Sequence, residues 1–180
     1  IWDKTGRLIF SLNESQEHAK ITDALNFSNN AIPAVKLIQD SSNGMRHMAI
    51  YTPVYSSDNN SPKIIGHIVA FTSTDELDQI LSHRNELETT GEIYLVNEDH
   101  FMVTESLFVN NAPFNQRVDT MPVSECFDND QSYSGTYNDY RGMPILGISF
   151  CDTTNDLVLL TEMDEKEILR PLFDLQEKII

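Results

Sequence analysis

Thr72-Ser73-Thr74-Asp75-Glu76 closes an apolar run and opens a predicted helix, and Thr161-Glu162-Met163-Asp164-Glu165 repeats that change of character 89 residues later. In each stretch a strand-like segment gives way to acidic residues, which suit the first turn of a helix. One five-residue match of this kind can arise by chance. Its weight depends on whether other features recur at the same spacing.

Two further features recur in the same order. A proline stands in a predicted strand at Thr52-Pro53-Val54 and again at Met143-Pro144-Ile145, which is 91 residues later. A strand-turn-strand pattern covers residues 1–11 and recurs at residues 93–104, an offset of a little over 90. The shared order and offset predict two copies of one fold in tandem.

Alternation and turn residues predict similar elements in the two copies. The first copy has predicted strands at residues 1–3, 7–10, 34–38, 45–55 and 63–73, with a helix at about 14–30. The second has predicted strands at 92–96, 101–104, 134–138, 143–150 and 157–162, with a short helix near 123–127. Antiparallel hairpins with helices on their faces make this an α+β fold of two PAS-like modules.

The repeat divides the chain into four parts. The first module covers residues 1–74, a linking helix covers 75–90, the second module covers 91–163, and a closing helix covers 164–180. Asp164 and Glu167 have the spacing of a capping box at the start of the closing helix. Its apolar residues are spaced as in a coiled-coil seam, at Ile168, Leu172, Leu175 and Ile179. This helix either packs on its own module or leaves it toward a membrane and a dimer partner.

Composition narrows the classes of partner. The chain has 180 residues, is 40% hydrophobic, and carries a formal charge of −16 from 28 acidic and 12 basic residues. So acidic a surface repels nucleic acid and anionic lipid headgroups. No apolar stretch approaches the roughly 20 residues that cross a membrane, so we expect any tether to lie outside both ends. Cys126 and Cys151 fit no metal or redox motif; they are either a disulfide or two half-buried thiols.

Enzyme motifs are not found. The five histidines show neither H-x-x-x-H nor H-E-x-x-H spacing, and no G-x-S-x-G, Walker or Rossmann glycine pattern occurs. We therefore predict no catalytic residues, no metal site and no cofactor. An unrecognised hydrolase stays as a rival, and a cysteine hydrogen-bonded to a histidine in a cleft would support it.

The best candidate pocket lies on the sheet of the first module. Alternation over residues 45–55 places His47 and Tyr51 on one face among small neighbours, as a ligand cavity requires. Arg46 falls on the other face and would clamp a carboxylate only if it pointed inward. Asn26 and Phe27 on the preceding helix, and Phe71 on the last strand, are predicted to close the site. Ordinary packing or surface exposure is the alternative for every one of these residues. An equivalent cavity in the second module is the weaker candidate, and three residues are predicted to line it: Tyr94, Glu105 and Tyr140.

Several stretches of the chain resemble the double Cache family of sensor domains. The second half resembles its membrane-proximal module in four stretches, residues 90–97, 101–106, 140–147 and 157–165. The first half resembles the membrane-distal module at residues 50–55 and 66–77. The resemblance implies an extracytoplasmic sensor of a prokaryotic membrane receptor, feeding a histidine kinase, a cyclase or a chemoreceptor. It also implies a long amino-terminal helix, for which this chain has no counterpart.

These observations predict small-molecule sensing in the distal module and transmission through the second module to the closing helix of a homodimer. The rival is a scaffold that binds no solute and serves dimerisation. The ligand is left open, because the Arg-x-Trp-Tyr stretch of amino-acid-sensing members is missing. Trp2 is the only tryptophan, and Phe71 stands where those members carry an aspartate.

Overall fold

The computed structural model describes residues 1–3, 33–40, 44–57, 61–82 and 89–177. The chain divides into two compact units, Ile1–Thr74 and Asp75–Ile180, here called unit 1 and unit 2. The predicted strand at residues 7–10 and the predicted helix at about 14–30 lie outside the described residues.

Unit 1 contains an antiparallel sheet, sheet A. Its strands are β1 (Trp2–Asp3), β2 (Ala34–Gln39), β3 (Arg46–Tyr55) and β4 (Ile64–Ser73), in the order β1-β4-β3-β2. β-branched and aromatic residues favour these strands, and turn-forming residues separate them. Between β2 and β3, Gly44 adopts a φ of +73°, which only glycine enters without strain.

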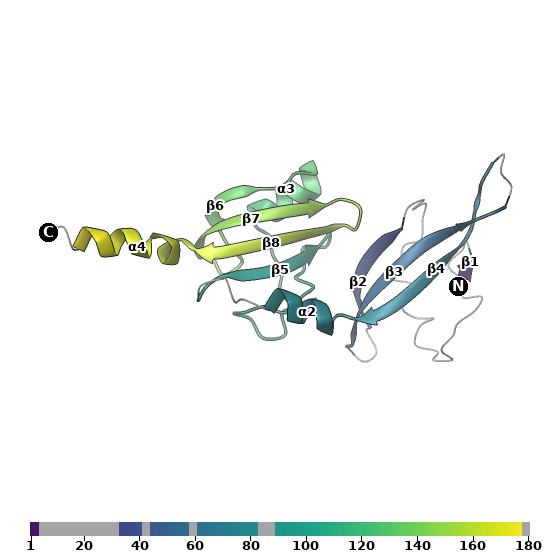
Figure 1. Cartoon of the computed structure of the whole chain (residues 1–180), viewed down its shortest axis with the longest axis horizontal. Helices are drawn as coiled ribbons and strands as arrows, with labels where there is room; N and C mark the ends of the chain where they lie inside the picture. Colours follow the sequence, from purple (N-terminus) through teal and green to yellow (C-terminus); the bar gives the residue numbers. More distant parts are fainter. Residues whose placement is uncertain (4–32, 41–43, 58–60, 83–88, 178–180) are drawn as a thin grey trace. The chain divides into compact units, whose positions relative to one another are not determined.

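Unit 2 contains a second antiparallel sheet, sheet B (Figure 1). Its strands are β5 (Glu92–Asn97), β6 (Ser134–Asn138), β7 (Pro144–Asp152) and β8 (Leu157–Asp164), in the order β5-β8-β7-β6. Strand for strand this is the order of sheet A. The two sheets confirm the predicted α+β fold class.

Three helices complete the described elements: α2 (Asp75–Ser82), α3 (Met121–Asn129) and α4 (Glu165–Glu177). Acidic residues occupy the first turns of α2 and α4, where the helix dipole favours them. In α3 a proline sits at the start, and Asp130 ends the helix in the left-handed conformation. In Figure 1, α3 lies on one side of sheet B, and α4 continues from the end of β8.

Two details of the predicted repeat are wrong. Pro53 is the eighth residue of β3, whereas Pro144 is the first residue of β7, so the two prolines are not equivalent. The expected strand at residues 101–104 forms only the isolated bridges Val96↔Met102 and Phe101↔Arg117. The backbone there divides its hydrogen bonds, since Met102 N–H donates to Gln116 and Val103 N–H donates to Leu95.

The core of unit 2 lies between one face of sheet B and α3. Its fully buried side chains include Tyr94, Val96, Met102, Val123, Val158 and Leu160. Cys126 of α3 and Cys151 of β7 form a disulfide, with 5.2 Å between their Cα atoms. The opposite face of the sheet is open, and Ile148 and Phe150 are 61% and 62% exposed.

The predicted capping box at the start of α4 is wrong. The carboxylate of Asp164 accepts a 2.7 Å bond from Arg141. Glu167 does not turn back to Asp164: its carboxylate accepts the backbone N–H groups of Thr89 and Thr90, at 2.9 and 2.7 Å, and the Thr90 hydroxyl. Glu167 therefore binds the donors of Thr89 and Thr90, which lie just before β5, instead of the start of its own helix. These bonds attach α4 to the start of β5.

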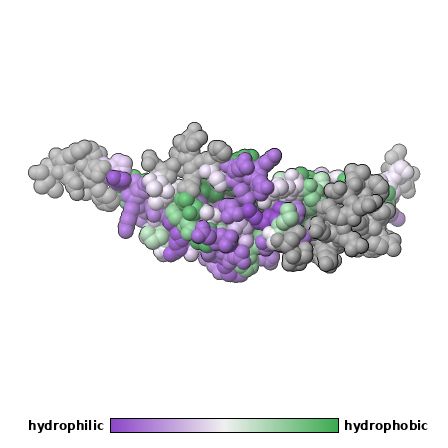
Figure 2. Space-filling view, turned by 90° about the horizontal axis from the view of Figure 1, so that it is seen from below, coloured by the Kyte–Doolittle hydropathy of each residue, from purple (hydrophilic) through white to green (hydrophobic). Residues whose placement is uncertain are grey.

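Hydrophilic residues dominate the coloured surface in Figure 2, with smaller hydrophobic areas among them. Among the described helices, none combines the length and the apolar character needed to cross a membrane.

Candidate functional site

One face of sheet A carries three of the six predicted site residues. The β3–β4 register pairs Ala49 with Phe71 and Tyr51 with Val69, while His47 pairs with Ser73. Paired residues of an antiparallel ladder point to the same face. His47, Tyr51 and Phe71 therefore share one face, as alternation predicted. The rings of His47 and Phe71 lie edge to face, with centroids 6.4 Å apart.

This face is the buried side of sheet A. Tyr51 is 2% exposed and Ala49 is completely buried. Ala49 and Ile38 form a small apolar cluster, against which Val69 and Phe71 pack. The three predicted residues on this face are thus held on paired strands rather than on loops.

Two basic residues on the same face were missed by the sequence reasoning. Lys36 of β2 pairs with Ala49, and His67 of β4 pairs with Pro53. His67 is 2% exposed, and burial lowers its pKa. Alternation along β4 places His67 in phase with Val69 and Phe71, so this signal was available in the sequence. The paired positions of this face hold one lysine, two histidines and no acidic residue.

Arg46 is not brought together with these residues. It pairs with Gln39 and immediately precedes His47, so its side chain leaves the opposite face of the sheet. Asn26 and Phe27 lie outside the described residues.

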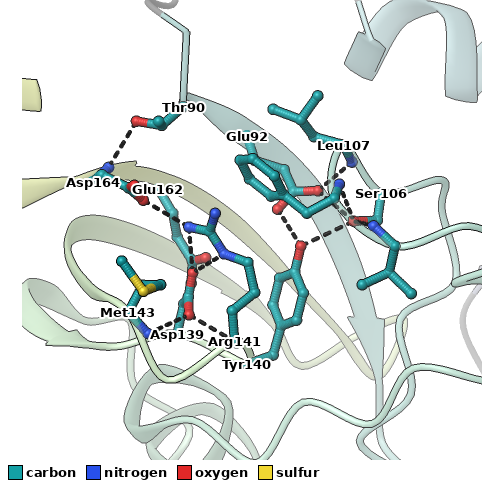
Figure 3. A network of polar contacts seen from close by, with 12 residues as sticks. Thr90, Glu92, Ser106, Leu107, Asp139, Tyr140, Arg141, Met143, Glu162 and Asp164 are labelled. Carbon is teal, nitrogen blue, oxygen red and sulfur yellow. Dashed lines mark hydrogen bonds and ion pairs between the residues drawn. The ribbon is translucent and has the colours of Figure 1, made fainter.

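The corresponding face of sheet B carries two buried carboxylates. Glu92 of β5 and Glu162 of β8 are directly opposite in the ladder, and they are 4% and 3% exposed. Glu92 is fully engaged, as Figure 3 shows: it accepts bonds from the Ser106 hydroxyl at 2.8 Å, the Leu107 N–H at 2.6 Å and the Tyr140 hydroxyl at 2.6 Å.

Glu162 is held by two tyrosines. The hydroxyls of Tyr94 and Tyr137 both donate to its Oε1, at 2.8 and 2.7 Å. Burial raises the pKa of both tyrosines, and the charge of Glu162 adds to that effect. Burial also raises the pKa of Glu162 to about 7; the tyrosine hydrogen bonds oppose this rise, and Asp139 and Glu92 add to it.

One cation lies beside this pair. Arg141 donates to Asp139 at 2.6 Å and to Asp164 at 2.7 Å, which commits its guanidinium to those two carboxylates (Figure 3). Asp139 also accepts the backbone N–H groups of Arg141 and Met143. This cluster fixes the turn between β6 and β7.

The cavity considered for the second module is filled by these contacts. The rings of Tyr94 and Tyr140 pack edge to face at 5.6 Å, and each hydroxyl is bound to a carboxylate. Glu105 lies instead at an open hollow of about 40 Å³, lined also by Glu92, Ser106 and Leu107. That volume suits a water molecule rather than an organic solute.

Two observations concern the alternatives of a cysteine hydrolase and a metal site. Cys126 and Cys151 are joined, so neither provides a thiolate nucleophile for a hydrolase. Across the described ranges, no three His, Cys, Asp or Glu side chains are grouped so as to hold a metal ion.

No protein-family model and no protein with a curated description matches the sequence. Solved structures do match. One match is the extracellular domain of mmHK1S-Z3, a protein described as a histidine kinase. The alignment covers 97% of this chain and 64% of the length of that domain, at a TM-score of 0.59 and 12% identity. The periplasmic sensory domain of the Campylobacter jejuni chemoreceptor Tlp1 aligns with 88% of this chain and 57% of its own, at a TM-score of 0.55 and 13% identity.

The chain has the fold of an extracellular sensor domain. The predicted likeness to double Cache domains is thereby confirmed at the level of the fold. A third match is the ligand-binding domain of the Pseudomonas aeruginosa chemoreceptor PctC in complex with GABA, at a TM-score of 0.51 and 13% identity. It aligns with 87% of this chain and 66% of its own length. This chain thus spans about six tenths of the length of these sensor domains.

Proposed function

We propose that this chain is the extracytoplasmic sensing part of a membrane receptor, in which unit 1 binds a small solute and unit 2 relays binding toward a cytoplasmic module, most simply a histidine kinase. The observation that carries this proposal is the buried face of sheet A. It holds Lys36, His47 and Tyr51 on rigid strands, within a fold that solved sensor domains share.

The disulfide supports an extracytoplasmic location. Disulfides persist in oxidising compartments such as the periplasm and the cell exterior, and cytosolic reductants remove most of them. The bond between Cys126 and Cys151 therefore fits a domain that lies in the periplasm or outside the cell.

The charges on sheet A favour a ligand with a carboxylate. A lysine and two histidines occupy paired positions of the face, in a chain of net charge −16. Such a cluster of donors suits an anion in an otherwise acidic protein. In this proposal Lys36 and His47 bind the carboxylate, Tyr51 donates a hydrogen bond, and Phe71 packs against the carbon skeleton.

Chain continuity supports the proposed relay. Sheet A ends at Ser73, and α2 begins two residues later at Asp75, so β4 leads directly toward unit 2. β8 leads in the same way into α4, whose first turn is fixed to Thr89 and Thr90 by Glu167. We propose that α4 continues toward the membrane and meets the same helix of a second copy.

Thermal unfolding of the chain with a panel of carboxylic acids, amino acids, amines and sugars tests the sensing proposal. A ligand at 100 times its Kd stabilises the folded state by about 2.7 kcal/mol, which is readily measured. We expect carboxylates to raise the unfolding temperature of wild type and to lose this effect in Lys36→Met. A matched control, Lys166→Met in α4, should keep it. If no solute of any class shifts the transition, the non-binding scaffold is the better description.

A further inference from the structure

Glu162 differs from Glu92, the carboxylate directly opposite it in the ladder, in having half of its hydrogen-bonding capacity unused. Both tyrosine hydroxyls bind Oε1. Within the described part of the chain, Oε2 is buried and has no hydrogen-bond partner. An ionised carboxylate with one bare buried oxygen is costly, because nothing replaces the lost hydration.

The groups around Glu162 offer little compensation for a negative charge. Those that face it come from β5, β6, the β6–β7 turn and β8: Glu92, Tyr94, Tyr137, Asp139, Tyr140, Arg141 and Asp164. Three of the seven are acids, and the ion pairs of the single cation, Arg141, go to Asp139 and Asp164. Glu92 lies directly across the ladder, where like charges destabilise a strand pair.

The sheet is shaped to hold Glu162 in this position. Gly147 is its partner on β7, and a Cβ atom at Gly147 would come within 2.5 Å of the Tyr137 hydroxyl oxygen. The absence of a side chain at this position therefore leaves room for Tyr137 to reach across β7 to Glu162. If the residue at position 162 only filled the core, the sheet would not need a glycine at position 147 to admit the Tyr137 hydroxyl.

We infer that Glu162 is a proton-binding site of unit 2, and that proton uptake tightens the end of sheet B from which α4 begins. Glu162 lies on β8 three residues before Glu165, the first residue of α4. In the protonated form the repulsion from Glu92 disappears and β5 and β8 pair without opposition. In the ionised form the same pair repels just where Thr90 and Glu167 attach α4. This inference does not depend on solute binding by unit 1.

Carbon-detected NMR of the glutamate carboxyl groups in the full chain tests the inference directly. Between pH 5 and 8.5 we expect one glutamate carboxyl with a midpoint near 7, matching the raised pKa of Glu162, and its absence from Glu162→Gln. The exposed Glu98→Gln is the matched control and should leave that midpoint unchanged. If no glutamate carboxyl titrates between pH 6 and 8, the inference is wrong.

Tyr137→Phe provides a second test that keeps the titrating group. Loss of its hydroxyl removes one of the two hydrogen bonds that favour the ionised form, so the neutral midpoint should move to higher pH. An unchanged or lower midpoint would show that the carboxyl being followed is not Glu162 in this environment.

Amide exchange tests the tightening. After correction for the intrinsic rate, the Asp164 N–H, which donates to the Thr90 hydroxyl, should be several-fold better protected at pH 6 than at pH 8. Glu162→Gln should remove this difference, since its side chain is uncharged at both values. Equal protection of the wild-type amide at both values would overturn the link to α4.

Discussion

Sheet A and sheet B have the same strand order and bury the same side of their ladders, yet the two buried faces have opposite chemistry. The paired positions on the buried face of sheet A hold Lys36, His47 and His67. Those on the buried face of sheet B hold Glu92 and Glu162, which are directly opposite each other. A fold repeated within one chain therefore fixes where side chains are presented, while the side chains alone decide what each copy does.

The buried carboxylates of unit 2 are held in a network of hydrogen bonds. Tyrosines, Ser106 and backbone donors bind these carboxylates, and the hollow that Glu92 lines is of water size. Such a network rigidifies its unit and leaves no room for a solute. The comparison supports the assignment of solute binding to unit 1 and of proton binding to unit 2.

The largest expected effect concerns the two cores. Leu160→Ala should destabilise unit 2 by about 4 kcal/mol, because Leu160 is completely buried in a cluster of large side chains. Val69→Ala should cost unit 1 about 1 kcal/mol, since Val69 is only partly buried. Urea unfolding of each variant measures both values, and Phe150→Ala on the open face of sheet B serves as the control. Equal losses at Leu160 and Val69 would contradict the difference in packing.

Removal of the disulfide should affect unit 2 alone. The Cys126→Ala/Cys151→Ala variant opens a link between residues 25 apart, which costs about 3.5 kcal/mol in the chain-entropy account. Reduction of the wild-type chain should produce a loss of similar size, whereas the double variant should not respond to reductant. Amide NMR signals of sheet A follow the transition of unit 1 separately. A shift of that transition on reduction would refute the restriction to unit 2.

The two units should respond to pH in opposite directions. The pKa of Glu162 is raised from 4.5 to about 7, so the stability it contributes is complete below pH 4.5 and is lost as pH rises through 7. The full loss is about 3 kcal/mol. The pKa of His67 is lowered from 6.5, so its contribution is present above pH 6.5 and is lost on acidification.

Unfolding at pH 5 and pH 8, followed separately by amide NMR signals of sheet A and of sheet B, measures both directions. Glu162→Gln should flatten the response of unit 2, and His67→Gln should flatten that of unit 1. Parallel pH profiles in the two units would contradict the assignment of these groups.

The smallest expected effect is on solute binding. Tyr51→Phe removes one hydroxyl from the buried face of sheet A and should weaken binding of a carboxylate ligand about tenfold, equivalent to about 1.4 kcal/mol. Tyr94→Phe is the matched change in unit 2 and should leave the affinity unaltered. Calorimetric titration of both variants separates the units, and an equal loss in both would place the solute elsewhere.

Local patterns predicted the strands well, since alternation and turn residues are properties of neighbouring positions. The strand at residues 134–138 has the predicted bounds, and those at 45–55 and 63–73 differ from the observed strands by one residue at one end. Glu92 and Glu162 also carried a local signal, because each falls in the buried phase of an alternating strand. Their direct opposition joins positions 70 residues apart, and such a register cannot be read from local patterns.

Alternation correctly predicted which of the proposed site residues on β3 share a face of sheet A, and their role in binding stays a prediction. Alternation placed His47 and Tyr51 on one face and Arg46 on the other. The capping-box prediction for Glu167 was wrong because the competing donors, Thr89 and Thr90, lie far away in sequence. Local rules describe which groups a residue can bind, while the tertiary fold decides which of those groups is nearest.

The attachment of α4 by Glu167 has a mechanical consequence. The helix has 13 residues and is therefore about 20 Å long, and it is held to the module at its first turn. A tilt of about 10° at that end moves the other end by about 3.4 Å, which is slightly more than the length of a typical hydrogen bond. The contact of Glu167 with Thr89 and Thr90 thus acts as a pivot for α4. A displacement of less than 1 Å at Thr90 becomes a severalfold larger displacement at the far end of the helix.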